Sequence, residues 1–297
     1  MKKIWVLLVL VGMFFVCNAG AVNVITKVTN PENGSGEADG IQPGGDRENS
    51  YSWCMDILHQ EDGDYLYVGS NRDVLYLMFY AAGLTDQPDQ PDQPDLIDEI
   101  FTDIPKPAGF PDNPPDSDLK ARIFRWKITD PPGNWEWVYT SPYIAPGIPI
   151  PREIGYRGAI TFSDENGTDT AIYIVTSAFP NEISMSTRVL KFPYNFKPGD
   201  EPKEVLRIVS SSQQAYTLRP ITKYNKKLYV GTSENKIYES SLPEVQPAAG
   251  WPPNTSTEGW NVVATDEDFN GAQQWHKYFL WQFQEYAGYL YVVLGSV

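Results

Sequence analysis

Short apolar and aromatic runs alternate with polar turn residues along most of the chain. The clearest example is the segment from Leu218 to Val263, where four runs rich in Tyr, Ile, Val or Trp are each bounded by Asn, Gly, Pro or Ser. Antiparallel strands joined by turns have this pattern. We therefore predict four short strands here, at Leu218–Tyr224, Leu228–Gly231, Lys236–Glu239 and Trp260–Val263.

The same pattern returns further along the chain at a constant interval, with the spacing inside the motif kept. Tyr216, Arg219, Tyr224 and Leu228 are matched by Tyr278, Trp281, Tyr286 and Leu290, and Arg157 precedes Arg219 by the same interval. Self-similarity at a fixed period is typical of radial repeats. The sequence therefore predicts an all-β fold, a β-propeller of four-stranded antiparallel blades.

About three and a half blades can be assigned over residues 51–297. The first blade is predicted from Trp53–Leu58, Tyr65–Ser70, Ala121–Trp126 and Trp135–Tyr139, the second from Tyr156–Phe162, Ala171–Val175, Thr187–Phe192 and Glu204–Ile208, and the fourth from Trp281–Tyr286 and Tyr289–Val293 only. Propellers typically have about four to eight blades. We therefore expect a truncated or incomplete propeller, or a distorted four-bladed ring closed by a strand from the leader.

The first 21 residues have the organisation of a secretory signal peptide. Lys2 and Lys3 precede an apolar run from Ile4 to Val16, and small residues follow up to Ala21. A short positive region, an apolar stretch and an Ala-x-Ala site are the three parts of such a signal. Cleavage is expected after Ala19 or Ala21. This predicts a protein that is secreted, periplasmic or on the cell surface, with no transmembrane segment in the mature chain.

The two cysteines limit the chemistry of the mature chain. Once the signal is removed, Cys54 is the only cysteine left, so an intramolecular disulfide and a cysteine-based zinc site are excluded. A second interpretation makes Cys17 the acylated cysteine of a bacterial lipoprotein. Phe14, Phe15 and Val16, which precede it, are larger than the residues that such processing prefers.

Two segments are too polar to form part of a core. Residues 22–50 are predicted to be a flexible leader, in which Val22–Val28 is a candidate closing strand. Residues 84–118 form an acidic, Pro-rich insertion with three successive Asp-Gln-Pro units, after a short apolar stretch at Asp73–Gly83 that could form a helix. The insertion joins the second and third strands of the first blade. It is interpreted as a solvated spacer or, alternatively, as a lid or partner contact.

The net charge disfavours some classes of binding partner. The formal charge is −15 at pH 7, and removing Lys2 and Lys3 with the signal makes it −17. A protein this acidic is repelled by nucleic acids and by anionic membranes. Nucleic acid is therefore excluded as a partner, whereas a protein or glycan ligand is compatible with the charge.

Several motifs in the predicted blades are shared with a known group of proteins. The segments Leu228-Tyr229-Val230-Gly231-Thr232, Ile237-Tyr238 and Trp260-Asn261-Val262-Val263 resemble the repeats of secreted bacterial and archaeal β-propeller proteins, whose blades read Arg, a strand, Leu-Tyr-Val-Gly-Thr, a second strand and Trp-x-x-Val. Most members have no known function, so the resemblance implies only the fold and secretion. The chain departs from the group in its acidic insertion and in Val293, which replaces the glycine after Leu-Tyr-Val.

Arginine and tryptophan share one position of the innermost strands. These residues are Arg157 and Arg219, with Trp281 in the next blade and Trp53 in the first. Innermost strands line the channel of a propeller, where arginines and indoles could bind an acidic or sugar ligand through forked hydrogen bonds and stacking. Alternatively, each arginine pairs with a carboxylate or carbonyl group of the neighbouring blade.

A candidate cation site lies in the second blade. Asp164, Asn166 and Asp169 surround Gly167 with oxygen-bearing side chains of the kind that Ca²⁺ prefers. An Asn-Gly turn between two strands explains the same residues without a metal. No other cofactor is indicated.

Two functions remain compatible with the sequence. The first is a non-catalytic, secreted propeller that binds a protein or glycan. The second is an extracellular hydrolase or lyase acting on glycans, which would need a pair of carboxyl groups or a Tyr or His base in the channel. No such pair occurs at a fixed spacing, and His59 and His276 are the only histidines, so the binding protein is favoured.

Overall fold

The computed structural model describes residues 49–72, 120–131, 134–145, 148–164, 167, 169–178, 186–209, 218–248, 253–270 and 278–296. The predicted signal peptide, the closing strand Val22–Val28, the helix at Asp73–Gly83 and the insertion 84–118 lie outside these residues. Within them, no helix is long and apolar enough to cross a membrane.

The first blade is an antiparallel meander of four strands. It consists of β1 (Asn49–Gln60), β2 (Gly63–Arg72), β3 (Arg122–Lys127) and β4 (Trp135–Thr140). Strand β1 begins at Asn49, so its first two residues belong to the segment 22–50 that is predicted to be the leader. The second strand extends to Arg72, and Asn49 pairs with it there.

Two more four-stranded meanders and one hairpin follow. The second blade is β7 (Gly155–Ser163), β8 (Thr170–Ser177), β9 (Ser186–Pro193) and β10 (Lys203–Val209); the third is β11 (Leu218–Tyr224), β12 (Lys227–Thr232), β13 (Ile237–Ser240) and β14 (Asn261–Ala264); the fourth unit is β15 (Tyr278–Tyr286) with β16 (Tyr289–Ser296). This confirms the predicted all-β fold with three four-stranded antiparallel blades and a half blade.

Three short elements were not predicted from the sequence. The connection between the first and second blades contains a hairpin of β5 (Tyr143–Ala145) and β6 (Ile148–Pro151), and α4 (Asp266–Asn270) follows the third blade. Each is only three to five residues long. Apolar periodicity needs longer windows than these to be recognised.

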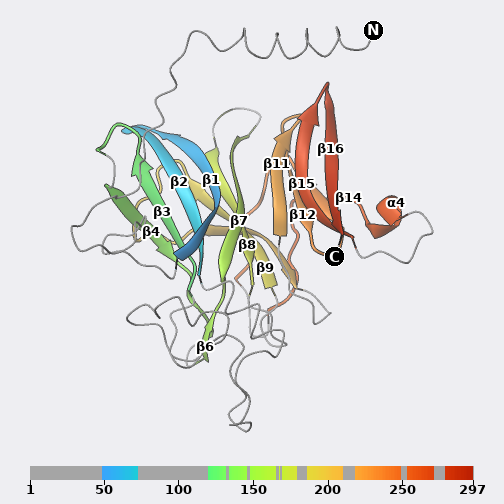
Figure 1. Cartoon of the computed structure of the whole chain (residues 1–297), viewed down its shortest axis with the longest axis horizontal. Coiled ribbons are helices and arrows are strands. Elements are labelled where there is room, and N and C mark those ends of the chain that lie inside the picture. The colour runs from blue at the N-terminus through green and yellow to red at the C-terminus, as the bar shows by residue number, and fades with distance from the viewer. Residues whose placement is uncertain are drawn as a thin grey trace, which may run out of the picture.

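The first strands of successive blades lie next to one another. Strand β1 contacts β7, β7 contacts β11, and β11 contacts β15. Figure 1 shows the first blade in blue and green on the left, β7 in the middle, and β15 and β16 in red on the right. The blades are therefore arranged as in a β-propeller, with the first strand of each blade innermost.

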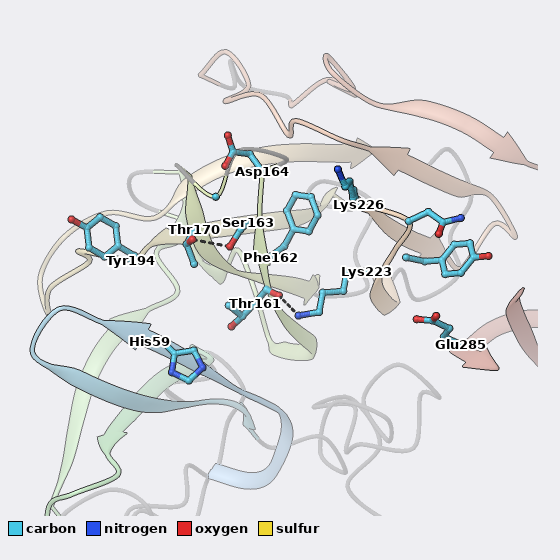
Figure 2. Close-up of a pocket in the computed structure, with 13 residues that line it drawn as sticks. His59, Thr161, Phe162, Ser163, Asp164, Thr170, Tyr194, Lys223, Lys226 and Glu285 are labelled. Atoms are coloured by element: carbon cyan, nitrogen blue, oxygen red, sulfur yellow. Dashed lines mark hydrogen bonds between the residues drawn. The ribbon is translucent and has the colours of Figure 1, made fainter. Parts of the chain in front are cut away.

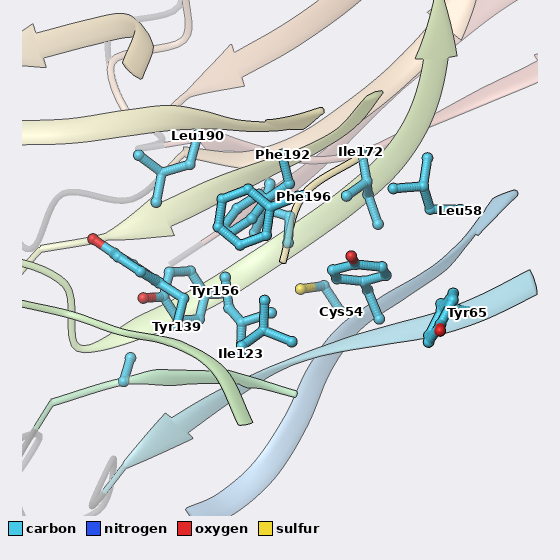
Figure 3. Packing of buried hydrophobic residues seen from close by; sticks show 14 residues of the cluster. Cys54, Leu58, Tyr65, Ile123, Tyr139, Tyr156, Ile172, Leu190, Phe192 and Phe196 are labelled. Atoms are coloured by element: carbon cyan, nitrogen blue, oxygen red, sulfur yellow. The ribbon is translucent and has the colours of Figure 1, made fainter. Parts of the chain in front are cut away.

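A separate hydrophobic core fills each space between neighbouring blades. The first, between the first and second blades, contains Ile123, Tyr156 and Phe192 (Figure 3), the second joins the second blade to the third, and the last lies between the third blade and the fourth unit. A further buried cluster, of Val68, Phe124, Trp126 and Trp135, belongs to the first blade alone. Aromatic residues of the strands thus contribute to several separate clusters rather than to one central core.

The second blade, the third blade and the fourth unit each place one large side chain at an equivalent position next to the preceding blade. It comes from the residue just before a β-bulge in the innermost strand, and its neighbour is on the second strand of the preceding blade. These pairs are Tyr156 on Gly69 and Leu280 on Gly231, and the equivalent residues between the second and third blades, Leu218 and Val175, belong to the same hydrophobic cluster. A Cβ atom at Gly69 would lie 2.6 Å from Tyr156 Cβ, and one at Gly231 would lie 3.0 Å from Leu280 Cδ1. Both glycines therefore provide space for the next blade.

The joint between the first and second blades also contains a buried ion pair. Glu153 has no exposed surface, and its carboxylate accepts hydrogen bonds from Arg152 Nε (2.5 Å) and Ser141 Oγ (2.6 Å). Arg188 Nη1 lies 3.9 Å from the same carboxylate. These partners come from β9 and from the two sides of the β5–β6 hairpin. The charge of Glu153 therefore links elements of both blades.

Candidate functional site

All four innermost strands contain a β-bulge at the same register position. The register shifts between Ser52 and Cys54, between Tyr156 and Gly158, between Leu218 and Ile221, and between Leu280 and Gln282. A bulge leaves an extra residue in the strand and redirects its side chain. The extra residues include Trp53, Arg157, Arg219 and Trp281, so all four predicted ligand-binding residues lie at one level of the innermost strands.

A glycine brings two of these strands close together at the level of the bulges. A Cβ atom at Gly158 would lie 2.8 Å from the carbonyl oxygen of Arg219 and 2.9 Å from Ile221 Cγ2. Any side chain larger than hydrogen would push β7 and β11 apart. Gly158 thus holds the backbones that carry Arg157 and Arg219 at a short separation.

Burial and a neighbouring charge affect the two arginines. Burial lowers the pKa of Arg157 to about 9, and the positive charge of Arg219 acts in the same direction. Burial also lowers the pKa of Arg219. Arginine nevertheless stays protonated at neutral pH. Both guanidinium groups therefore keep a positive charge in surroundings that oppose it, and a bound anion would relieve that cost.

The arginines are oriented by different partners. Arg157 Nε donates a hydrogen bond to Ser177 Oγ at 2.9 Å, within the second blade. The Arg219 guanidinium carbon lies 4.2 Å from the ring centroid of Trp281, in the fourth unit. Trp281 is 50% exposed, so its indole also faces solvent. The side chain of Trp53 lies outside the described part of the structure, although its backbone belongs to β1.

A pocket lies at the other end of the innermost strands, where each strand turns into the next. Its volume is about 900 Å³, and residues from all four units line it (Figure 2). His59 belongs to the first hairpin, Thr161 and Asp164 to the second blade, Lys223 to the third and Glu285 to the fourth unit. Thr161 follows Arg157 by four residues, which corresponds to about 13 Å of strand. The arginines and the pocket thus occupy opposite ends of the same strands.

One register position links neighbouring innermost strands beside this pocket. Thr161 Oγ1 donates to the carbonyl oxygen of Ile57 at 2.6 Å, and Lys223 Nζ donates to the carbonyl oxygen of Thr161 at 3.1 Å. Glu285 occupies the same position in the fourth unit, pairing with Leu290 as Lys223 pairs with Leu228. A carboxylate cannot donate such a bond. Glu285 is instead exposed at the pocket.

The residues of the predicted calcium site form turn and strand contacts. Asp164 Oδ1 accepts a hydrogen bond from the backbone nitrogen of Asp169 at 2.9 Å, and the Asp169 carboxylate pairs with the Lys191 ammonium group. Asn166 lies outside the described residues. Within those residues, no group of three His, Cys, Asp or Glu side chains could hold a metal ion. Calcium binding by Asp164, Asn166 and Asp169 therefore stays a prediction.

The sequence reasoning missed the pocket at the hairpin ends. Thr161, Lys223 and Glu285 each follow one of the predicted residues Arg157, Arg219 and Trp281 by the same short spacing, so they recur at the same interval along the chain. A polar residue that recurs at the end of an otherwise apolar strand could have indicated the pocket at this end of the strands. Tyr194, which also lines the pocket, follows the third strand of the second blade and has no such periodic signal.

No protein-family model and no curated protein matches the sequence. Among solved structures, the chain is similar to an exo-β-1,3-galactanase from Clostridium thermocellum, with 12% sequence identity and a TM-score of 0.35. The match covers 82% of this chain and 41% of the galactanase chain. At that TM-score the likeness carries no information about activity.

Proposed function

We propose that this chain is a secreted, non-catalytic β-propeller that binds acidic glycans at the level of Arg157, Arg219 and Trp281. The observation that supports this most strongly is the arginine pair. Two guanidinium groups from neighbouring innermost strands lie within electrostatic reach of each other, and the pKa of each is lowered. The sequence pattern of residues 1–21 supports export of the protein.

An acidic sugar carries the group that this pair would bind best. A carboxylate accepts two parallel hydrogen bonds from the planar fork of an arginine, and such charged hydrogen bonds are stronger than neutral ones. Binding would also offset the repulsion between Arg157 and Arg219. A lysine pair would supply the charge without the fork.

The indole of Trp281 would bind the sugar ring. One side of the ring system lies against Arg219, and its 50% exposure leaves surface for a ligand. The apolar face of a sugar stacks well on an aromatic ring that is fixed in place. Trp53, at the same register position in the first blade, is the second candidate for such a contact.

The overall charge would restrict the length of the ligand. With a formal charge of −15, or −17 once the predicted signal is removed, the protein repels long polyanions, and the arginine pair attracts anions only locally. Short uronic acid oligosaccharides therefore suit the site better than extended acidic polymers.

Calorimetric titration with a short oligogalacturonate, compared with a neutral galacto-oligosaccharide of equal length, tests the proposal. We expect the acidic oligosaccharide to bind more tightly. Arg157→Gln and Arg219→Gln should each lower its affinity by about tenfold or more, because hydrogen bonds to charged groups contribute about 1.5–3 kcal/mol. Arg219→Lys should recover only part of the loss, because it restores the charge without the fork.

Lys203→Gln is the matched control, since Lys203 is an exposed cation on β10, the outer strand of the second blade. Equal affinities for the acidic and neutral oligosaccharides, or unchanged binding in both arginine variants, would refute the proposal. Release of new reducing ends from the same saccharides would favour the alternative of a hydrolase or lyase.

A further inference from the structure

Backbone carbonyl groups at one register position of the innermost strands accept side-chain hydrogen bonds. In the hairpin β11–β12, Tyr224 pairs with Lys227 across a two-residue turn, so Lys223 belongs to the next pair, which exchanges no backbone hydrogen bonds. The carbonyl group of Lys223 therefore points away from β12. The equivalent carbonyl of Ile57 accepts a bond from Thr161 Oγ1, and that of Thr161 accepts one from Lys223 Nζ. The side chain at this position thus bonds to the preceding innermost strand in the second and third blades.

The series of bonds ends at Glu285 in the fourth unit. Strand β15 lies beside β11, and the Tyr224 hydroxyl donates to the carbonyl oxygen of Gly288 in the turn of the fourth unit. Figure 2 shows the Glu285 carboxylate directed into the pocket on the side of Lys223. Within the described residues, that carboxylate has no hydrogen-bond or ion-pair partner. The Lys223 carbonyl and the Glu285 carboxylate are therefore two acceptors at one level, and no described side chain donates between them.

The two lysines of the pocket do not supply this donor. Lys223 Nζ is turned to Thr161, on the side of β7. Lys226 is exposed in the turn, and Figure 2 shows its side chain directed away from Glu285. A ligand with a primary ammonium group would supply the donor, because such a group has three N–H bonds and a positive charge. Hydrogen bonds from an ammonium group to a carboxylate are among the stronger ones in proteins.

The opposite side of the pocket has groups that suit a sugar. Tyr194 lies across the pocket from Glu285 in Figure 2, and it is 44% exposed, so its ring offers a surface for stacking. Thr161, Ser163 and Thr170 add hydroxyl groups to the lining. The volume of about 900 Å³ lies near the upper end of the range of roughly 300–1,000 Å³ that small-molecule sites have. The pocket therefore has room for more than one sugar unit.

We infer that this pocket binds a short oligosaccharide of amino sugars. The ammonium group of one unit would donate to the Glu285 carboxylate and the Lys223 carbonyl, and another unit would stack on Tyr194. The negative charge of the protein would attract such a cationic ligand. The pocket and the arginine pair occupy opposite ends of the innermost strands, so the inference does not depend on binding of acidic glycans.

Calorimetric titration of the purified full chain with a β-1,4-linked trimer of glucosamine tests the inference. Its N-acetylated form is the matched ligand, because acetylation removes the charge of the amine. We expect the free amine form to bind about tenfold more tightly or better. Glu285→Gln should lower its affinity by about tenfold or more and should not change that of the N-acetylated form. Glu285→Lys should abolish binding of the free amine form, because the new side chain can itself donate to the Lys223 carbonyl, as Lys223 does to that of Thr161.

Glu267→Gln is the control, since Glu267 is exposed in α4 and does not line the pocket, and this variant should bind as the unmodified protein does. The thermal midpoint of each variant separates loss of binding from loss of folding. Equal affinities for the two trimers, or an unchanged affinity in Glu285→Gln, would overturn the inference. Equally tight binding of trilysine would show that the pocket recognises charge alone and would also overturn it. A loss of affinity for the short oligogalacturonate in Glu285→Gln would contradict two separate sites.

Discussion

The joint between the first and second blades and the joint between the third blade and the fourth unit use the same packing but different supporting contacts. In both, a large residue before a bulge meets a glycine. The first joint adds the buried Glu153 and the hydrogen bonds from Thr161 to the first innermost strand. Both joints contain an apolar cluster, and the joint between the third blade and the fourth unit adds the hydrogen bond from the Tyr224 hydroxyl to the carbonyl oxygen of Gly288.

This difference separates what positions a blade from what stabilises it. The large residue and the glycine set the spacing in both joints, so they define the arrangement of the strands. The buried charge makes the first joint sensitive to loss of one partner, because an unpaired charge in the interior is costly. The polar contact described at the joint between the third blade and the fourth unit is an exposed hydrogen bond, so this joint should tolerate its loss.

The largest effect is expected from Glu153→Ala. The substitution leaves Arg152 and Arg188 without the carboxylate that lies between them, and breaking such a buried pair typically costs about 3–5 kcal/mol. Urea unfolding measures the loss in free energy of unfolding. Glu61→Ala, in the exposed turn between β1 and β2, should change it by less than about 0.5 kcal/mol. A loss of similar size in both variants would contradict the role of Glu153 in the first joint.

A reciprocal pair of substitutions tests the packing of the joint between the third blade and the fourth unit. Gly231→Val should cost about 1–3 kcal/mol, because its Cβ would meet Pro220 Cγ at 2.6 Å and Leu280 Cδ1 at 3.0 Å. Val293→Gly, at the equivalent position one repeat later, should cost about 1 kcal/mol at most, since Val293 is exposed there. If the two variants lose the same stability, positions 231 and 293 do not differ in their surroundings as described.

The smallest effect is expected from Tyr224→Phe. This change removes the hydroxyl that bonds to Gly288 and should lower the free energy of unfolding by about 1 kcal/mol. Tyr286→Phe is the matched control, because Tyr286 is the exposed counterpart of Tyr224 and should give no measurable change. An equal loss in both variants would show that the hydrogen bond from Tyr224 to Gly288 does not stabilise the joint between the third blade and the fourth unit.

The sequence predicted those parts of the fold that depend on local patterns. Tyr224 and Tyr286 each precede a two-residue turn with positive φ angles, at Asn225–Lys226 and Ala287–Gly288. The rings of Tyr224 and Tyr229 lie 6.2 Å apart at 57°, and those of Tyr286 and Tyr291 lie 6.2 Å apart at 56°. Strand pairing and turn geometry are set by neighbours in the chain, so equal spacing gave equal hairpins.

The contacts between blades could not be predicted in this way. Glu153 follows the short β5–β6 hairpin, and nothing in its surrounding sequence indicates that it meets Ser141 and Arg188 in a closed interior. Tyr224 and Tyr286 likewise occupy equivalent positions but differ in exposure, because Gly288 in the turn of the fourth unit bonds to Tyr224, whereas Tyr286 is 71% exposed. Only one of the two levels of the candidate site was expected from the sequence. The bulge level followed from the spacing of Arg157 and Arg219, whereas the pocket depends on how four hairpin ends converge.

Amide hydrogen exchange of the hairpins β11–β12 and β15–β16 tests the central claim most directly. The claim is that equivalent hairpins differ only in how they are covered by neighbouring blades. We predict slower exchange in β11–β12, because β12 is packed on both faces and β16 on one. Equal protection of the two hairpins, or faster exchange in β11–β12, would contradict the account.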